Sequence, residues 1–281
     1  MGDENQCGSV KRKGCTDASF AVNIALQTLR EFGHSTYVIF IDLVKAYDTV
    51  NRTLLWLVLE KYGIPCKVIT ILKKLYNNTT ISLKIEKIES IFKSTCGVKQ
   101  GDNLAPILFI IFMHAVTQTL ERKWNFSKPD FRWFPNTKTT NKIRGKLDKI
   151  SWKNKGINFT FFQSFYDDDA AYLLMNRADA INAIKLLNKH FRRFGLTIHT
   201  GNKDTKEPSK TEFIFVPAPG TTASPSDTAD IYIDEHRYIN SCDEFQYLGS
   251  RITSSQKCDS DTNNRIKKAQ SFSFALNKPV F

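Results

Sequence analysis

The feature that most constrains this chain is a run of three aspartates, Asp167, Asp168 and Asp169, with an aromatic, apolar segment on each side. Aspartates are rare inside strands, so the alternating apolar residues predict two strands, at 159–165 and 172–174, joined by an acidic turn. Such a turn places oxygen ligands at one edge of a sheet. Three adjacent negative charges repel one another, and a divalent cation would compensate them. The alternative for a run of this kind, taken by itself, is a solvated acidic turn.

The chain carries a large excess of positive charge. Its 281 residues include 40 Lys and Arg against 28 Asp and Glu, a formal net charge of +12. Hydrophobic residues make up 41%, enough for an ordinary packed core in one large domain or two small ones. A positive balance of this size favours nucleic acid over a membrane surface, because the sequence has no basic amphipathic anchor. Charge that serves only solubility is the alternative.

The cysteines and the longest apolar run bear on the compartment. Six cysteines occur without a C-x-x-C pair or a secretory leader, which predicts free thiols in a reducing environment. The apolar run at 104–116 is too short to span a membrane and predicts a core helix. We therefore expect an intracellular protein, cytoplasmic or nuclear, that is not secreted and has no membrane partner.

Apolar residues recur at helical or strand spacing along most of the chain. Asp17 and Asn51 are placed to cap two helices, and the first of these is expected to bury a stripe that includes Phe20, Ile24 and Phe32. Helices are predicted over 17–32, 54–62, 68–76, 104–116 and 178–194. Strands are predicted at 37–41, 80–85, 159–165, 172–174, 196–199, 212–216, 231–233 and 245–248. The interleaving favours the α+β class, with a sheet backed by helices.

Asp42 follows the buried strand at 37–41. A carboxylate at a strand end either caps a helix or belongs to a site. Together with the acidic turn, it allows two strand ends to present carboxylates to a shared pair of metal ions. Two ions about 3.5–4 Å apart can activate an attacking oxygen and stabilise the leaving one in phosphoryl transfer. This is the chemistry of polymerases and nucleases.

Five stretches follow one another in a set order and spacing between residues 37 and 250. They are FIDLVKAYD at 40–48, GVKQGDNLAPILF at 97–109, YDDD at 166–169, GL at 195–196 with SKT at 209–211, and FQYLG at 245–249. Together they resemble the motifs of reverse transcriptases of the non-LTR retrotransposon type, with Ala105 where serine is usual. The resemblance implies a polymerase palm, a ferredoxin-like antiparallel sheet backed by helices.

The resemblance also implies a metal site. Asp42, Asp168 and Asp169 would bind two Mg²⁺ ions, with Mn²⁺ as a possible substitute. Neighbours in an extended strand point to opposite faces, so Asp167 and Asp169 are the alternative pair within the run. We prefer Asp168 and Asp169, because Tyr166 then takes the ring position of the motif.

The same resemblance assigns residues to the substrate. Tyr47 would crowd the 2′-hydroxyl of a ribonucleotide and so favour deoxynucleotides, the alternative being a core tyrosine. Gln100 would lie beside the incoming nucleotide with Gly101 and Leu43, the alternative for Gln100 being a turn residue.

Two further roles follow from the resemblance. Lys210 is the catalytic candidate for protonating or screening the departing pyrophosphate; Lys203 and Lys206 are rivals, and all three are alternatively solvated. The primer end would be held by Tyr247, Leu248 and Gly249.

The expected division of the chain has three parts. Residues 1–36 are a partial fingers segment, in which Gln6 and Gly8 match the family and Ser9 and Val10 stand where an aromatic and a basic residue are usual. Residues 37–250 form the palm, with a basic and aromatic excursion at 122–156. Residues 251–281 begin a thumb, and we expect neither a complete thumb nor complete fingers.

The expected function is that of an RNA-directed DNA polymerase, probed with an RNA template, a DNA primer and deoxynucleoside triphosphates as partners, and encoded as part of a retrotransposon polyprotein. A catalytically silent nucleic-acid-binding remnant is the alternative from another class. An RNA-directed RNA polymerase is a further alternative that Tyr47 disfavours, since such an enzyme accepts a 2′-hydroxyl. The oligomeric state is left open.

Overall fold

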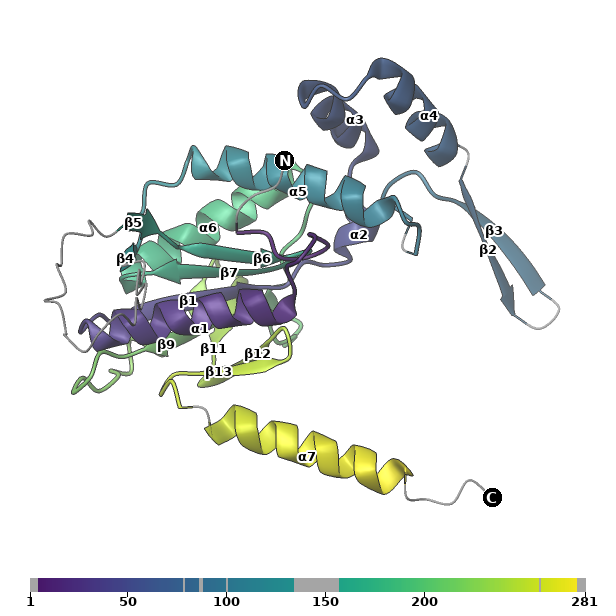
Figure 1. Ribbon diagram of the computed structural model, residues 1–281. Helices are drawn as coiled ribbons and strands as arrows, with labels where there is room; N and C mark the ends of the chain where they lie inside the picture. The colour runs from purple at the N-terminus through teal and green to yellow at the C-terminus, as the bar shows by residue number, and fades with distance from the viewer. Residues whose placement is uncertain are drawn as a thin grey trace, which may run out of the picture.

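The computed structural model describes residues 5–77, 79–85, 88–99, 101–133, 157–257 and 259–276. Its centre is a seven-stranded sheet with the order β10-β11-β9-β1-β7-β6, in which β8 also pairs with β11 (Figure 1). The strands of this sheet are β1 (Thr36–Ile41), β6 (Gln163–Tyr166), β7 (Asp169–Leu174), β8 (Gly201–Asn202), β9 (Glu212–Val216), β10 (Ile231–Tyr232) and β11 (Arg237–Ser241).

The sheet is mixed, which corrects the wholly antiparallel sheet expected from the sequence. β11 runs parallel to β9, whereas the other strand pairs of the sheet are antiparallel. The connection from β9 passes through 217–230 and β10, and this length allows the chain to return in the direction of β9. β11 was not predicted, because only its central Ile239 is buried and the strand lacks a clear alternation.

The two strands around the acidic turn are confirmed. β6 and β7 form an antiparallel hairpin in which Tyr166 pairs with Asp169, so Asp167 and Asp168 make the turn. The expected first strand of that hairpin is shorter than predicted, since β6 begins only at Gln163.

The residues before β6 belong to a separate two-stranded sheet. It pairs β4 (Asp130–Trp133) with β5 (Ile157–Thr160), and the turn of chain at 161–162 separates it from β6. Within the excursion expected at 122–156, residues 134–156 lie outside the described part of the chain.

Side chains on the two faces of the sheet pack into two cores. Alternate residues of β1 point to opposite sides: Tyr37, Ile39 and Ile41 enter the core formed with α5 and α6, and Val38 and Phe40 enter the core formed with α1 and the β12–β13 hairpin (Figure 1). The helices and the hairpin are α1 (Cys15–Glu31), α2 (Ala46–Thr49), α3 (Arg52–Lys61), α4 (Cys66–Tyr76), α5 (Ala105–Glu121), α6 (Arg177–Arg193), α7 (Asp259–Leu276), β12 (Glu244–Tyr247) and β13 (Ser250–Thr253).

The caps of two helices differ in how well they were predicted. Asn51 caps α3 as expected, its side chain accepting a hydrogen bond from the Leu54 amide at 3.1 Å. The cap assigned to Asp17 is wrong. α1 starts two residues earlier after Gly14, and the Asp17 carboxylate accepts the Gly14 amide at 2.8 Å from within the first turn.

The buried stripe expected on α1 is also wrong. Phe20, Ile24 and Phe32 are 63%, 44% and 76% exposed. α1 instead lays a face of smaller residues, including Ala18 and Val22, on the sheet. Small side chains allow the helix to approach the strands closely, so the close packing decides which face is buried.

Part of the chain between β1 and α5 projects away from the sheet. α3 and α4 lie together, and the hairpin of β2 (Thr80–Ile85) and β3 (Ile88–Lys93) extends outward from them (Figure 1). The hairpin confirms the strand spacing predicted from residue 80. Its outer surface keeps Ile81, Ile91 and Phe92 more than half exposed.

Three other expectations meet the structure as follows. The strand predicted at 196–199 is wrong, since that stretch makes only an isolated bridge between Ile198 and Leu43. The five cysteines in the described residues are all free thiols, as expected. Among the described residues, no helix combines the length and the apolar character that a membrane crossing requires.

Candidate active site

The register of the sheet brings Asp42 and Asp169 to neighbouring strand ends. β1 and β7 pair from Tyr37 with Leu174 to Ile41 with Ala170, and the next position along each strand is Asp42 on one and Asp169 on the other. Both belong to the alternation that faces the core of α1 and the β12–β13 hairpin, so the two carboxylates leave the sheet on the same face.

The turn between β6 and β7 is held by the N-terminal segment. Asp167 has a left-handed backbone, with φ of 51°, and its amide donates a hydrogen bond to Gln6 Oε1 at 3.1 Å. The same oxygen accepts the Gly8 amide at 2.7 Å. On either side of Gln6, the Cys7 amide donates to the Phe165 carbonyl at 2.8 Å. The segment therefore adds to the edge of β6 and caps the acidic turn.

The Asp167 carboxylate faces this N-terminal segment. A Cβ atom on Gly8 would lie 2.6 Å from Asp167 Oδ1, and the Ser9 hydroxyl is 3.5 Å from Oδ2. Asp167 Oδ1 is buried and has no hydrogen-bond partner in the described structure. Asp167 is thus packed against Gly8 and Ser9, whereas Asp169 is paired by register with the end of β1.

The carboxylates of the cluster raise one another's pKa values. Burial, followed by the charges of Asp168 and then Asp42, raises the pKa of Asp169 from 3.8 to about 6. Burial is also the largest cause of the raised pKa of Asp168, to which Asp167 and Asp42 contribute. Negative charge is therefore concentrated at this strand edge in a partly desolvated setting, which favours a positively charged ligand.

The donor set fits a hard divalent cation in its chemistry. Carboxylate oxygens from Asp42, Asp168 and Asp169 are the ligands that Mg²⁺ prefers, and a cation would relieve the repulsion that raises their pKa values. Within the described residues, no three His, Cys, Asp or Glu side chains are already arranged as a metal-binding group.

The backbone of Asp42 is fixed by the stretch that contains Lys210. The Asp42 amide is 3.1 Å from Thr211 Oγ1, and the Asp42 carbonyl accepts the His199 amide at 2.8 Å. The Lys210 amide in turn donates to His199 Nδ1 at 3.2 Å. Lys210 therefore lies on the loop that supports the end of β1, and its side chain is exposed.

The two rival lysines lie further along the same loop. Lys203 Nζ sits over the ring of Tyr232, 4.1 Å from its centroid. Lys206 is exposed in the turn after β8, with a left-handed φ of 56°. Neither is linked to Asp42 by the hydrogen bonds that link the loop around Lys210.

Tyr47 lies between the core and the acidic turn. Its ring stacks on Phe109 with centroids 4.2 Å apart, which fixes one face of the ring. Burial, with smaller contributions from the charges of Asp167 and Asp168, raises the pKa of Tyr47 to about 12. The residue is only partly buried, so it combines a packing contact with proximity to the carboxylates.

The loop before α5 packs on the helix that carries Tyr47. The Val98 amide donates to the Tyr47 carbonyl at 2.8 Å, and a Cβ on Gly97 would lie 2.6 Å from the Asp48 carbonyl oxygen. Gly97 must therefore lack a side chain for this contact to form. Gly101 is exposed with φ of 89°, and Gln100 lies outside the described residues.

Leu43 and Ala105 are both core residues in this region. Leu43 is buried and pairs with Ile198, next to Asp42. Ala105 is completely buried at the start of α5, where its small side chain fits against the core.

The β12–β13 hairpin covers the same face of the sheet. Phe245 stacks on Phe40 with centroids 4.3 Å apart, and the Tyr247 hydroxyl donates to the Ser164 carbonyl at 3.4 Å. The charge of Asp169 contributes to the raised pKa of Tyr247, although burial is the main cause. Leu248 and Gly249 form the turn with φ of 50° and 87°, so the turn stands beside the acidic cluster.

Two supporting residues were not assigned a role from the sequence. Gln6 matched the family pattern, but its hydrogen bond to Asp167 joins residues 161 positions apart and has no local signal. Thr211 was quoted as part of a motif, and only the structure shows that its hydroxyl is paired with Asp42.

Comparisons with known proteins place this geometry in a family. The family model described as "Reverse transcriptase (RNA-dependent DNA polymerase)" matches residues 1–252. The chain therefore belongs to the reverse transcriptase family, and the expected resemblance to the non-LTR retrotransposon type is confirmed.

The curated relatives are retrotransposon polyproteins. The chain is similar to the Retrovirus-related Pol polyprotein from type-2 retrotransposable element R2DM of Drosophila melanogaster, at 31% identity over 119 residues, which is 42% of this chain and 11% of that protein. It is also similar to the Pol polyprotein from type-1 retrotransposable element R2 of Nasonia vitripennis, at 24% identity over 125 residues, 44% of this chain and 12% of that protein. The matched region spans about a tenth of each relative.

Solved structures agree on the fold. Apo telomerase from Candida tropicalis, truncated from its C-terminal domain, superposes with a TM-score of 0.53 at 12% identity, covering 91% of this chain and 41% of that one. The same telomerase in complex with a TWJ fragment of telomeric RNA gives a TM-score of 0.52 at 13% identity, covering 92% and 35%. At such identities the likeness concerns the fold alone.

Proposed function

We propose that this chain carries the polymerase palm of a retrotransposon reverse transcriptase and adds deoxynucleotides to a primer 3′-hydroxyl on an RNA template. The observation that carries the proposal is the register of β1 and β7, which brings Asp42 beside Asp169 on one face of the sheet. Family membership over residues 1–252 supports the same reaction.

Asp42, Asp168 and Asp169 are the residues we assign to the metal. The raised pKa of Asp169 and the concentration of charge support this assignment. When bound, a pair of Mg²⁺ ions supplies charge stabilisation to the attacking and leaving oxygens, and Mn²⁺ is the expected substitute. Asp167 is assigned instead to holding the turn, which its contacts with Gly8 and Ser9 support.

Tyr47 is assigned to sugar selection. Stacking on Phe109 holds the ring in one plane, so the ring cannot move aside for a 2′-hydroxyl without losing that contact. This assignment favours a DNA polymerase over an RNA polymerase. Leu43, Gly101 and Gln100 are assigned to the neighbourhood of the incoming nucleotide.

Lys210 and the β12–β13 turn complete the proposed site. The hydrogen bonds around Lys210 tie its loop to Asp42, which supports Lys210 over Lys203 and Lys206 as the residue that screens or protonates the pyrophosphate. The turn of Tyr247, Leu248 and Gly249 is assigned to the primer end.

The proposed division of the chain keeps residues 37–250 as the palm, with 1–36 as a fingers segment and 251–281 as the beginning of a thumb. Proposed partners are an RNA template, a DNA primer and deoxynucleoside triphosphates, in a cytoplasmic or nuclear setting. The net charge of +12 supports a nucleic-acid partner.

Primer extension tests the proposal. The full chain, with Mg²⁺ and a DNA primer on an RNA template, should incorporate deoxynucleotides, and Asp42→Asn or Asp168→Asn should abolish incorporation. Glu31→Gln, which changes an exposed acid on α1, is the matched control and should retain it. Incorporation that survives Asp168→Asn would refute the metal assignment.

The absence of a preassembled three-ligand group among the described residues favours one second candidate, a silent nucleic-acid-binding remnant. Titration with Mn²⁺, followed by its paramagnetic signal, separates the two. An active palm should bind Mn²⁺ and lose that binding in Asp42→Asn, whereas a silent remnant should bind nucleic acid and show no carboxylate-dependent Mn²⁺ binding.

A further inference from the structure

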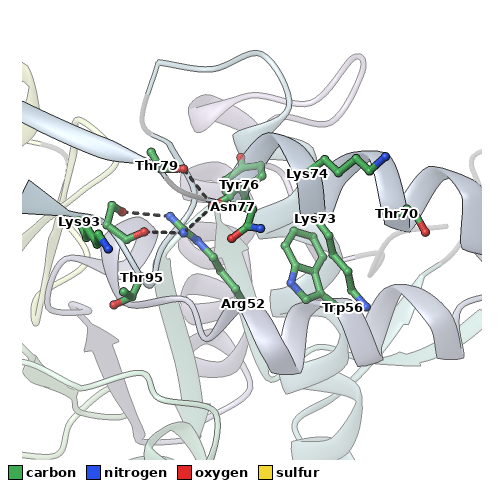
Figure 2. A pocket seen from close by; sticks show the side chains of 11 residues that line it. Arg52, Trp56, Thr70, Lys73, Lys74, Tyr76, Asn77, Thr79, Lys93 and Thr95 are labelled. Carbon is green, nitrogen blue, oxygen red and sulfur yellow. Dashed lines mark hydrogen bonds between the residues drawn. The ribbon is translucent and has the colours of Figure 1, made fainter.

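A groove runs between α3, α4 and the base of the β2–β3 hairpin, on the part of the chain that projects from the sheet. It encloses about 440 Å³ and is named here the α3–α4 groove (Figure 2). Its principal lining residues are Arg52, Trp56, Lys73, Lys74, Tyr76 and Lys93.

The charge of the α3–α4 groove is entirely positive. None of its eleven lining residues is an Asp or a Glu, and Lys73, Lys74 and Lys93 are exposed along its sides. The ion pairs found among the described residues all lie elsewhere, at Asp204, Asp234, Glu244 and Asp261. A lysine face that serves solubility is normally interspersed with acids, so this arrangement favours an anionic ligand.

The floor of the groove is rigid. The Arg52 guanidinium donates to the carbonyls of Gly97, Tyr76 and Ser94 at 2.8, 3.0 and 2.8 Å, and to Ser94 Oγ at 3.0 Å (Figure 2). These bonds join α3, the end of α4 and the loop after β3. Arg52 is therefore a structural residue, and the lysines at the rim are the cations left for a ligand.

Aromatic rings accompany the lysines. Trp56 lies edge-on to Tyr76 with centroids 5.9 Å apart, and Trp56 is only partly buried, next to Lys73 at the side of the groove (Figure 2). Cations beside a partly open aromatic ring suit single-stranded nucleic acid, whose phosphates pair with the lysines while an unpaired base stacks on the ring. A duplex, with its bases already stacked, makes no use of the ring.

The groove continues toward the proposed active site. A second cavity of about 650 Å³ shares Arg52, Lys93 and Ser94 with it and reaches Lys99 in the loop before α5. That loop is hydrogen-bonded to the carbonyl of Tyr47. The two cavities thus form a path from α4 to the residues assigned to the incoming nucleotide.

We propose that the α3–α4 groove binds the unpaired part of the RNA template before it is copied. In a templated reaction the strand reaches the nucleotide site unpaired, and this path ends there. Lys73, Lys74 and Lys93 hold its phosphates, and Trp56 stacks on a base. The inference rests on the proposed function, because it takes the bound strand to be the template.

Binding measured by fluorescence anisotropy, without divalent ions, tests the groove separately from catalysis. Two ligands are compared: a blunt primer–template duplex, and the same duplex with a 5′ RNA overhang of about ten nucleotides. For single strands, log affinity falls with log salt by about 0.7 per phosphate held, so three lysines correspond to a slope of about 2. The overhang should steepen the slope by this amount in the unmodified chain.

The triple variant Lys73→Ala, Lys74→Ala, Lys93→Ala should lose the added slope on the overhang ligand. The matched control removes three exposed cations from α6, on the other side of the molecule, by Lys185→Ala, Lys189→Ala and Arg192→Ala, and should retain it. An overhang that leaves the slope unchanged in the unmodified chain, or a slope retained by the groove variant, overturns the proposal.

The outcome is distinguishable from failure of the proposed function. A chain that incorporates no nucleotide but shows overhang binding lost only in the groove variant refutes polymerisation and keeps the groove as an RNA site. A chain that incorporates nucleotides but shows no overhang-dependent binding refutes the groove alone.

Discussion

Gly8→Ala is the substitution that most directly probes how the acidic turn is held. A Cβ on Gly8 would lie 2.6 Å from Asp167 Oδ1 and 2.7 Å from Asp167 Cγ, and closer still to the Asp167 amide nitrogen. Ordinary contact between such atoms begins near about 3.5 Å, so the turn must move by about 1 Å. The main obstacle is backbone rather than a flexible side-chain end, so no rotation relieves it.

The expected magnitude follows from the contacts that move. Overpacking of this kind destabilises by about 1–3 kcal/mol, and displacement also strains the hydrogen bond from Asp167 to Gln6, worth about 1 kcal/mol. We expect the free energy of unfolding to fall by about 2–4 kcal/mol. Because Asp168 and Asp169 follow directly, a shift of about 1 Å should lower the incorporation rate by about a hundredfold.

Urea denaturation and single-turnover primer extension measure the two effects. Gly14→Ala is the matched control, because a Cβ there meets only Asp17 Oδ2 at 3.9 Å, and it should change stability by less than about 1 kcal/mol. Extension is measured where both variants are folded. Equal rates for Gly8→Ala and Gly14→Ala would refute the role of this segment in positioning the carboxylates.

Three other predictions follow from the site. Tyr47→Ala should raise ribonucleotide use relative to deoxynucleotide use in extension assays, with Tyr47→Phe unchanged; equal loss of both substrates together with a stability loss of about 3–5 kcal/mol would make Tyr47 a core residue only. Since burial raises the pKa of Asp169 from 3.8 to about 6, the folded state holds its proton more tightly than the unfolded state, so the stability of the metal-free chain should fall as pH rises from about 4 to about 6. Asp169→Asn should therefore melt higher than the unmodified chain at pH 7 but not at pH 4, and an equal difference at both would contradict the assignment. Arg52→Lys should lower the free energy of unfolding by about 2–4 kcal/mol in urea, because one ammonium cannot replace the four hydrogen bonds of the guanidinium; a change under about 1 kcal/mol would show that these bonds are dispensable.

Local pattern was a reliable guide where a structure depends on neighbouring residues. The β6–β7 hairpin and β1 were predicted because alternating apolar residues and a polar turn are properties of short segments. The Asn51 cap was predicted for the same reason. Pattern failed for Asp17 and for the exposed Phe20, where the packing of α1 on the sheet decides which residues begin the helix and which face is buried.

By itself, the sequence determined that carboxylates stand at two strand ends and that the chain has the motif order of a reverse transcriptase. Only the tertiary structure decided that Asp42 and Asp169 are register neighbours, that Gln6 and Gly8 hold Asp167 away from them, and that the lysines of α4 line a groove. The reason is physical: these contacts join residues far apart in the chain, and their geometry depends on strand register and on close packing, which no local pattern encodes.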